Sequence, residues 1–131
     1  MNETNSLRSS LPLQLRFSDA DGLGHVNNAV FATLAELGRV DMLRRSSLPR
    51  PSLILARLAI DYRSQVKLSD ECRVDSWVVA VGNTSFTVRQ ELHASGRLAA
   101  EFEAVVVCFD YQEQKPMRVP DDLRSVLLGA G

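Results

Sequence analysis

The chain has 131 residues, 45% of them hydrophobic, and its 15 basic and 16 acidic residues leave a net charge of −1. This length suits one domain with a hydrophobic core, and the composition argues against global disorder. The balanced charge gives no support to nucleic-acid binding through a general positive field.

The cysteines and the hydropathy of the chain indicate the cellular compartment that we expect for the protein. Cys72 and Cys108 lie far apart and belong to no CxxC motif or Cys/His cluster, so we expect buried free thiols in a reducing environment. The N-terminal segment lacks the apolar stretch of a secretory signal, and no window reaches the roughly 18 apolar residues of a membrane span. We therefore expect a soluble cytoplasmic protein.

The first third of the chain predicts a tail, a strand, a turn and a helix. Residues 1–10 are polar and aperiodic, so we expect a flexible tail followed by a single domain over residues 11–128. Apolar and polar residues alternate from Leu11 to Ser18, which predicts a half-buried strand. A glycine-containing turn follows. Residues 28–43 are apolar around most of a helical circumference and predict a buried helix, with Asn27 or Asn28 as its N-cap and prolines 49 and 51 after its end.

The rest of the chain has a period of two, which indicates strands. Between residues 53 and 63 one strand face comprises Ile54, Ala56, Leu58, Ile60 and Tyr62. Further strands are predicted over Cys72–Val81, Ser85–Ala94 and Leu98–Asp110, and an amphipathic piece over residues 121–128. Short connections favour antiparallel pairing, and one long helix is available to cover the sheet. The predicted class is α+β, with a curved antiparallel sheet of five to six strands around one long central helix.

The turn at residues 17–28 (FSDADGLGHVNN) carries the candidate chemistry. It places Asp19 and Asp21 just before a helix N-terminus, where backbone N–H groups lack partners and the macrodipole is positive. A carboxylate beside donors that can hold a developing oxyanion suits acyl transfer. A plain capped turn with two solvated acids fits the same local sequence.

This topology, with F-x-D-x-D-x-x-G-H-V-N-N at the strand-to-helix turn, resembles the hot-dog-fold acyl-CoA thioesterases, in the branch of 4-hydroxybenzoyl-CoA thioesterase. The resemblance covers roughly residues 13 to 127. It includes A-E-L-G-R at 35–39, I-D-Y at 60–62, L-S-D-E at 68–71, G-N-T-S-F at 82–86 and K-P-M-R-V-P at 115–120.

The resemblance implies a set of site residues. Asp21 matches the family's catalytic carboxylate, which acts as nucleophile or as general base for water, and the oxyanion donor falls on the backbone N–H of Asn28. Some relatives have a histidine at the position of Asn28; here His25 lies three residues earlier and is expected to shape the loop. The implied substrate-binding residues are Gly24, Val26, Asn27, Thr84 and Ser85.

Other polar residues have simpler interpretations. Asp19 is expected to form the turn or pair with an arginine. Glu36 and Arg39 have the i,i+3 spacing of an ion pair, although another hot-dog branch uses a helix carboxylate in catalysis. No metal site is expected, because His93 lies far from Asp21 and His25 in the sequence. Exposed basic residues are available for the phosphates of coenzyme A, namely Arg57, Arg63, Lys67, Arg89 and Arg97.

The functional hypothesis is hydrolysis of an acyl thioester to a free acid and coenzyme A, with no cofactor beyond the coenzyme A of the substrate. The acyl carrier is coenzyme A or an acyl-carrier protein. The alternatives are a hot-dog dehydratase or hydratase, whose D-x-N-P-x-H arrangement is missing here, and a non-catalytic acyl-thioester-binding protein. The resemblance and the open sheet edges predict a homodimer or homotetramer, with Leu98–Phe109 as a candidate contact.

Overall fold

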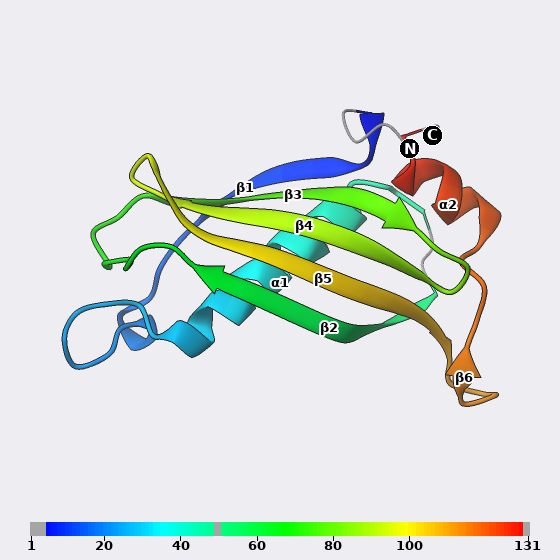
Figure 1. Cartoon of the computed structure of the whole chain (residues 1–131), viewed down its shortest axis with the longest axis horizontal. Helices are drawn as coiled ribbons and strands as arrows, with labels where there is room; N and C mark the ends of the chain where they lie inside the picture. Colours follow the sequence, from blue (N-terminus) through cyan, green and yellow to red (C-terminus); the bar gives the residue numbers. More distant parts are fainter. Residues whose placement is uncertain (1–4, 49–50, 130–131) are drawn as a thin grey trace.

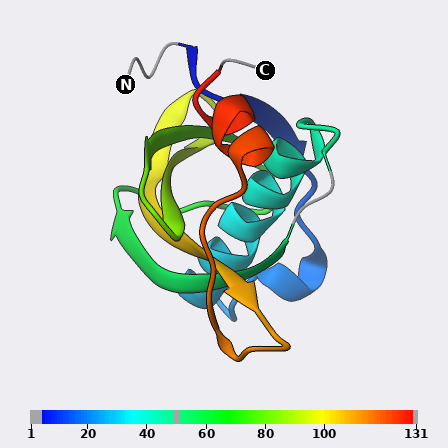
Figure 2. The ribbon, with the colours of Figure 1, turned by 90° about the vertical axis from the view of Figure 1, so that its right-hand side faces the viewer.

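A six-stranded antiparallel sheet curves around the helix α1 (Asn28–Arg44), as Figures 1 and 2 show for the computed structural model. The structure describes residues 5–48 and 51–129. The strands follow the order β1-β3-β4-β5-β2, and β6 pairs with the end of β5. Their bounds are β1 Arg8–Leu13, β2 Ser52–Tyr62, β3 Cys72–Val81, β4 Ser85–Ala94, β5 Arg97–Asp110 and β6 Lys115–Pro116. A short helix, α2 (Asp121–Leu127), follows, and the predicted α+β class is confirmed.

The first strand differs most from its prediction. β1 begins at Arg8, inside the stretch expected to be a tail, and pairs with β3 as far as Leu13. Residues 1–4 of that stretch lie outside the described residues. The strand does not continue to residue 18, because Phe17–Asp19 form a 3₁₀ turn that the Asp19 carboxylate closes by accepting from the Arg16 N–H at 2.7 Å. Phe17, expected on the apolar face, is therefore 90% exposed.

A β-bulge changes the face assignment of β2. The pairing of β2 with β5 shifts in register between Leu55 and Arg57. Leu53 and Leu58 consequently both pack against the core, although they are five positions apart and would lie on opposite faces of an unbroken strand. The predicted uninterrupted alternation from Ile54 to Tyr62 is wrong for this reason.

The helix α1 begins where its sequence predicts. The Asn27 side chain accepts from the Ala29 N–H at 2.9 Å and so caps the first turn. The buried side of α1 includes Phe31, Leu34, Ala35 and Met42, which divide between two core clusters along the helix. The opposite side is exposed, since Leu37 is 47% accessible, so the helix is covered on fewer sides than its composition predicts.

A buried polar network fastens α1 to the sheet. Gln90 on β4 donates to the Ala35 carbonyl oxygen at 2.7 Å and to Ser76 Oγ at 2.9 Å. It accepts from Arg39 Nη1 at 3.1 Å. Among residues 5–48 and 51–129 no ion pair joins Arg39 to Glu36, so the predicted helical pair is wrong. The guanidinium lies against β4 instead.

The order of the strands also decides which strand edges are free to pair with a second subunit. β5 pairs with β4 on one side and with β2 on the other. Edge-to-edge contact through Leu98–Phe109 is therefore excluded, and β1 and β2 are the outer strands. Within the described part of the chain, none of the helices combines the length and hydropathy needed to cross a bilayer.

We predict that Gly38→Leu destabilises the fold by about 1–3 kcal/mol or more, because a side chain at this site overpacks the helix–sheet contact. A Cβ at Gly38 would lie 2.8 Å from Ser76 Oγ and from Val74 Cγ1, and 2.9 Å from Gln90 Nε2. Urea unfolding would measure the loss. The control Thr33→Leu, at an exposed position of the same helix, is expected within about 0.5 kcal/mol of the wild type. Equal stability of the two variants would contradict the packing argument.

Candidate active site

Asp21 organises the loop that precedes α1. Its Oδ1 accepts from the backbone N–H of Leu23 at 2.8 Å and from that of His25 at 3.1 Å. Its own N–H donates to the His25 carbonyl oxygen at 2.7 Å, and Gly24 takes a left-handed φ of 81° that closes the loop. The predicted turn is therefore confirmed.

The same contacts set the charge of Asp21. Hydrogen bonds from the Leu23 and His25 N–H groups hold the pKa of the exposed Asp21 carboxyl below its usual value. The carboxylate is ionised at neutral pH. His25 contributes to this through its main-chain N–H, which donates to Asp21.

Asp19 is buried and has a structural role, as expected from the sequence. One carboxylate oxygen accepts from the Arg16 N–H at 2.7 Å and the other from Arg16 Nη2 at 3.0 Å. These contacts lower the pKa of the Asp19 carboxyl, the backbone hydrogen bond contributing most. The Asp19 carbonyl oxygen also accepts from the Asn27 N–H at 2.9 Å, which joins the 3₁₀ turn to the start of α1.

The first turn of α1 presents one donor to the surface. The N–H groups of Ala29 and Val30 both donate to Asn27, to its side chain and its carbonyl oxygen respectively. Across the described residues, no group accepts from the Asn28 N–H. This amide lies at the positive end of a 17-residue helix and is suited to hold a developing negative charge.

Asp21 and Asn28 line one cleft of about 560 Å³. The loop and the first turn of α1 form one wall of the cleft, and the end of β2 with residues 63–65 forms the other. Tyr62 joins the two walls, because its hydroxyl donates to the Asn28 carbonyl oxygen at 3.0 Å and its ring lies 5.0 Å from that of Phe31. The predicted residues Val26 and Asn27 line the cleft, whereas Gly24 shapes the loop beside it.

Sequence reasoning missed Tyr62 and Phe31 as site residues. Both were assigned to apolar runs, and Tyr62 is in fact 48% exposed. The available signal was its position at the end of a strand, next to Arg63 and Ser64. Arg63 also lines the cleft, which separates it from the other basic candidates.

Thr84 and Ser85 do not join this cleft within one chain. They lie at the turn between β3 and β4, and Ser85 is opposite Val107 of β5. Tyr62 is opposite Ala100, seven residues away along the same strand, roughly 23 Å at the rise of a strand. Figure 1 shows this turn and the loop before α1 at opposite ends of the sheet.

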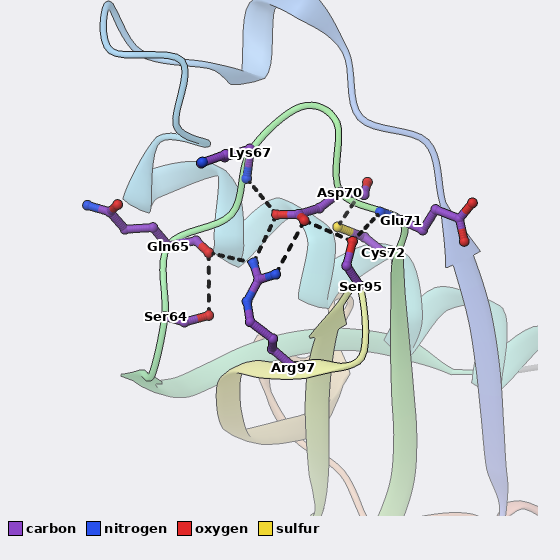
Figure 3. Close-up of polar contacts among 8 residues, drawn as sticks. All are labelled: Ser64, Gln65, Lys67, Asp70, Glu71, Cys72, Ser95 and Arg97. Atoms are coloured by element: carbon purple, nitrogen blue, oxygen red, sulfur yellow. Dashed lines mark hydrogen bonds and ion pairs between the residues drawn. The ribbon is translucent and has the colours of Figure 1, made fainter.

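The loop between β2 and β3 contacts the loop that contains Asp21 and helps to hold it in place. The Val26 N–H donates to the Val66 carbonyl oxygen at 2.7 Å, and His25 forms an isolated bridge with Lys67. This segment is held in turn by Asp70, which accepts from the Lys67 N–H, from Ser95 Oγ and from both Nη atoms of Arg97 at 2.8–3.4 Å (Figure 3).

Arg97 completes this support, because its Nη2 also donates to the Gln65 carbonyl oxygen at 3.1 Å. The Asp70–Arg97 pair therefore ties the loop to the turn between β4 and β5. The Arg97 hydrogen bond and the Lys67 N–H hold the pKa of the Asp70 carboxyl far below its usual value.

A group of metal-ligand side chains lies elsewhere, on the sheet. Asp75, Glu91 and His93 of β3 and β4 bring their ligand atoms within 4.8 Å of one another. The sequence does not reveal this juxtaposition, which arises because β3 and β4 pair. Asp75 already accepts from Ser10 Oγ at 2.6 Å and pairs with Arg73, so its oxygens are engaged.

Comparisons with known proteins agree on one family. Residues 15–127 match the family model described as the thioesterase-like superfamily. The acyl-CoA thioester hydrolase YbgC of Escherichia coli O6:H1 is 26% identical over 120 residues, which cover 86% of this chain and 90% of that protein.

Two solved structures share the fold at somewhat higher identity. A predicted thioesterase from Bacillus stearothermophilus is 29% identical with a TM-score of 0.85, and the match covers 92% of this chain and 93% of that one. A thioesterase from Thermus thermophilus, complexed with coenzyme A and Zn, is 31% identical with a TM-score of 0.80, covering 90% and 95%.

The Asp70–Arg97 pair generates a prediction about acid stability. The pKa of Asp70 is lower in the folded chain than its unfolded value of about 3.9, so ionised Asp70 stabilises the fold above that pH. The stabilisation is lost as the pH falls through the folded pKa. Asp70→Asn should therefore lower the unfolding free energy clearly at about pH 7, and the difference from the wild type should shrink below about pH 4.

Urea unfolding at a series of pH values would measure this difference. Asp121→Asn is the matched control, since Asp121 also pairs with an arginine but is fully exposed and holds no other element in place. Its effect should be small throughout. A gap between wild type and Asp70→Asn that is independent of pH would contradict the assignment.

Proposed function

The chain belongs to the thioesterase-like superfamily and is a thioester hydrolase, and on this premise we propose that it hydrolyses an acyl-CoA thioester with Asp21 as the catalytic carboxylate. The products are a free carboxylic acid and coenzyme A. One observation supports this assignment above the others: the ionised Asp21 carboxylate and the unpaired N–H of Asn28 line the same cleft.

The mechanism requires few groups, because a thioester has a good leaving group. The thioester carbonyl oxygen accepts from the Asn28 N–H, and the N-terminus of α1 stabilises the negative charge that develops on it. Asp21 either attacks the carbonyl carbon or removes a proton from the attacking water. Attack forms a mixed anhydride and expels the coenzyme A thiolate, and water then hydrolyses the anhydride and restores the carboxylate.

The lowered pKa of Asp21 bears on both routes, nucleophilic attack and proton removal from water. A general base works best when its pKa lies near the working pH, and the Leu23 and His25 N–H groups move the pKa of Asp21 in the opposite direction. The same shift also weakens the carboxylate as a nucleophile, so the charge state of Asp21 is compatible with either route.

Neighbouring side chains are proposed to orient the substrate. Tyr62 donates to the Asn28 carbonyl oxygen and so holds the first turn of α1, which carries the Asn28 N–H, against the end of β2. Arg63 lines the cleft, and we propose that it meets an anionic group of coenzyme A. The hydratase alternative requires a histidine side chain paired with a carboxylate, whereas His25 contacts Asp21 through its backbone.

We also propose that the working unit is at least a homodimer, formed along the outer edge of β2. Across the described residues β2 has one strand partner, β5, and Leu37, Leu55 and Tyr62 are exposed on the side of the molecule formed by α1 and β2. Two-fold antiparallel pairing of two β2 edges would bring the β3–β4 turn of one subunit toward the Asp21 end of the other. That arrangement would return Thr84 and Ser85 to the site as substrate-binding residues.

The central test is Asp21→Asn. We expect the turnover of acyl-CoA to fall roughly 10²- to 10⁴-fold, because the charge needed for attack or proton abstraction is removed. The fold should survive, since the Asn oxygen can still accept from the Leu23 and His25 N–H groups. A thiol-release assay over short, long and aromatic acyl-CoAs would measure turnover and identify the acyl preference.

Glu36→Gln and Asp19→Asn are the controls for this test. Glu36→Gln should retain turnover, and Asp19→Asn should act chiefly on stability because Asp19 is buried against Arg16. If Glu36→Gln abolishes turnover while Asp21→Asn does not, the catalytic group lies on the helix. A wild type that binds acyl-CoA without hydrolysing any thioester would establish the binding-protein alternative.

Sedimentation velocity tests the assembly. We expect the wild type to sediment as a dimer or larger, and Leu55→Lys to shift it toward the monomer, because a charge then lies on the exposed β2 edge. Tyr111→Lys changes an exposed aromatic residue beyond the end of β5 and should leave the assembly intact. A wild type that remains monomeric at high concentration would rule out a shared site.

A further inference from the structure

A second groove, of about 600 Å³, lies between the C-terminal half of α1 and the start of β2. None of the residues that line it lines the catalytic cleft. Most of its wall is aliphatic, from Val40 and Leu43 on α1, Leu53 and Leu55 on β2, and Val106 on β5. Two charged residues, Glu36 and Arg39, also line it.

Arg39 is the unusual member of this wall. The residue is only 6% exposed, yet its side-chain hydrogen bond goes to a neutral group, the Gln90 side-chain oxygen at 3.1 Å. Among residues 5–48 and 51–129 no carboxylate lies within 4.0 Å of its guanidinium, and Glu36 is exposed. Burial accordingly lowers the pKa of Arg39, with Glu36 opposing the shift in part.

A buried guanidinium without a counter-ion is costly, and buried arginines in folded proteins are normally paired. The four remaining N–H donors of Arg39 are suited to a planar anion, for which a carboxylate has the matching geometry. The aliphatic walls around it provide no partners for a second polar group. The complementary ligand is therefore an anion at one end and apolar along the rest of its length.

We propose that this groove binds a carboxylate attached to an apolar chain, with the carboxylate on Arg39 and the chain against Val40, Leu43 and Leu53. The inference rests on the proposed function for its biological source, because thioester hydrolysis releases a molecule of this class. A free acid product would place its own carboxylate on Arg39. An acyl group with a second carboxylate at its far end offers the same chemistry.

Calorimetric titration with decanoate, below its micelle concentration, tests the site directly. The wild type should bind decanoate at least about tenfold more tightly than decanol, which has the same chain without the charge. Arg39→Met should weaken decanoate binding roughly 10- to 100-fold while leaving decanol binding unchanged. Arg39→Lys should retain part of the preference, and Arg44→Met, at an exposed arginine of the same helix, should retain all of it.

Equal binding of decanoate and decanol by the wild type would overturn the proposal, as would a preference that survives Arg39→Met. The comparison of the two ligands on the wild type needs no variant, so it decides the question even if Arg39→Met does not fold. Absence of binding would also overturn it, because a partner subunit or a side chain would then fill the groove.

A kinetic arm distinguishes the two sources of the carboxylate. If the ligand is the released acid, decanoate should inhibit hydrolysis of decanoyl-CoA in the wild type and lose that inhibition in Arg39→Met. If it is the far end of the acyl group, the ratio of kcat/KM for the mono-CoA thioester of decanedioic acid to that for decanoyl-CoA should fall in Arg39→Met. Titrations repeated on Asp21→Asn keep binding separate from turnover, so a failure of the proposed hydrolysis leaves the test of the groove intact.

Discussion

The structure depends on the attachment of one helix to the concave face of the sheet. Gln90 makes this attachment specific, because its amide joins the Ala35 carbonyl oxygen of α1 to Ser76 of β3 and to Arg39. Gly38 brings the helix backbone close to the same side chains. Apolar contacts on either side of this network provide most of the stability, but they do little to fix the position of α1 along the sheet. A buried amide with three hydrogen-bond partners permits only one such position. The N-terminus of α1, and with it the Asn28 amide, takes its place from that contact.

Three carboxylates near the site are stabilised in their ionised form by the same kind of hydrogen bond. Asp19, Asp21 and Asp70 each accept from backbone N–H groups, and these bonds lower the pKa of each carboxyl. Two of them also pair with arginines and hold loops in place. Asp21 has no ion pair among the described residues and faces the cleft. The same local chemistry therefore produces two acids that are paired with arginines and one that is not, and the unpaired acid is the one that we propose to be catalytic.

The cleft and the groove lie at two ends of the same boundary between α1 and β2. Asn28 meets Tyr62 at one end, and Leu43 lies with Leu53 at the other. Both therefore border the strand edge at which a second subunit would add. In the dimer that we propose, the second subunit would therefore lie beside both cavities.

The sequence alone determined most of the elements and the turn before α1, because these depend on neighbours in the chain. The period of two defines β3 and β4 to the residue, and Asp21, Gly24 and Asn27 form the turn and cap that their chemistry indicates. Tertiary structure decided whatever depends on contact between distant segments. The bulge in β2 placed Leu53 against the core, β4 supplied the hydrogen-bond partner of Arg39 in place of Glu36, and strand order placed β5 inside the sheet with Thr84 far from Asp21. Helical spacing makes an ion pair geometrically possible, but a buried amide across the helix–sheet contact competes for the same guanidinium, and only the packed structure selects between them.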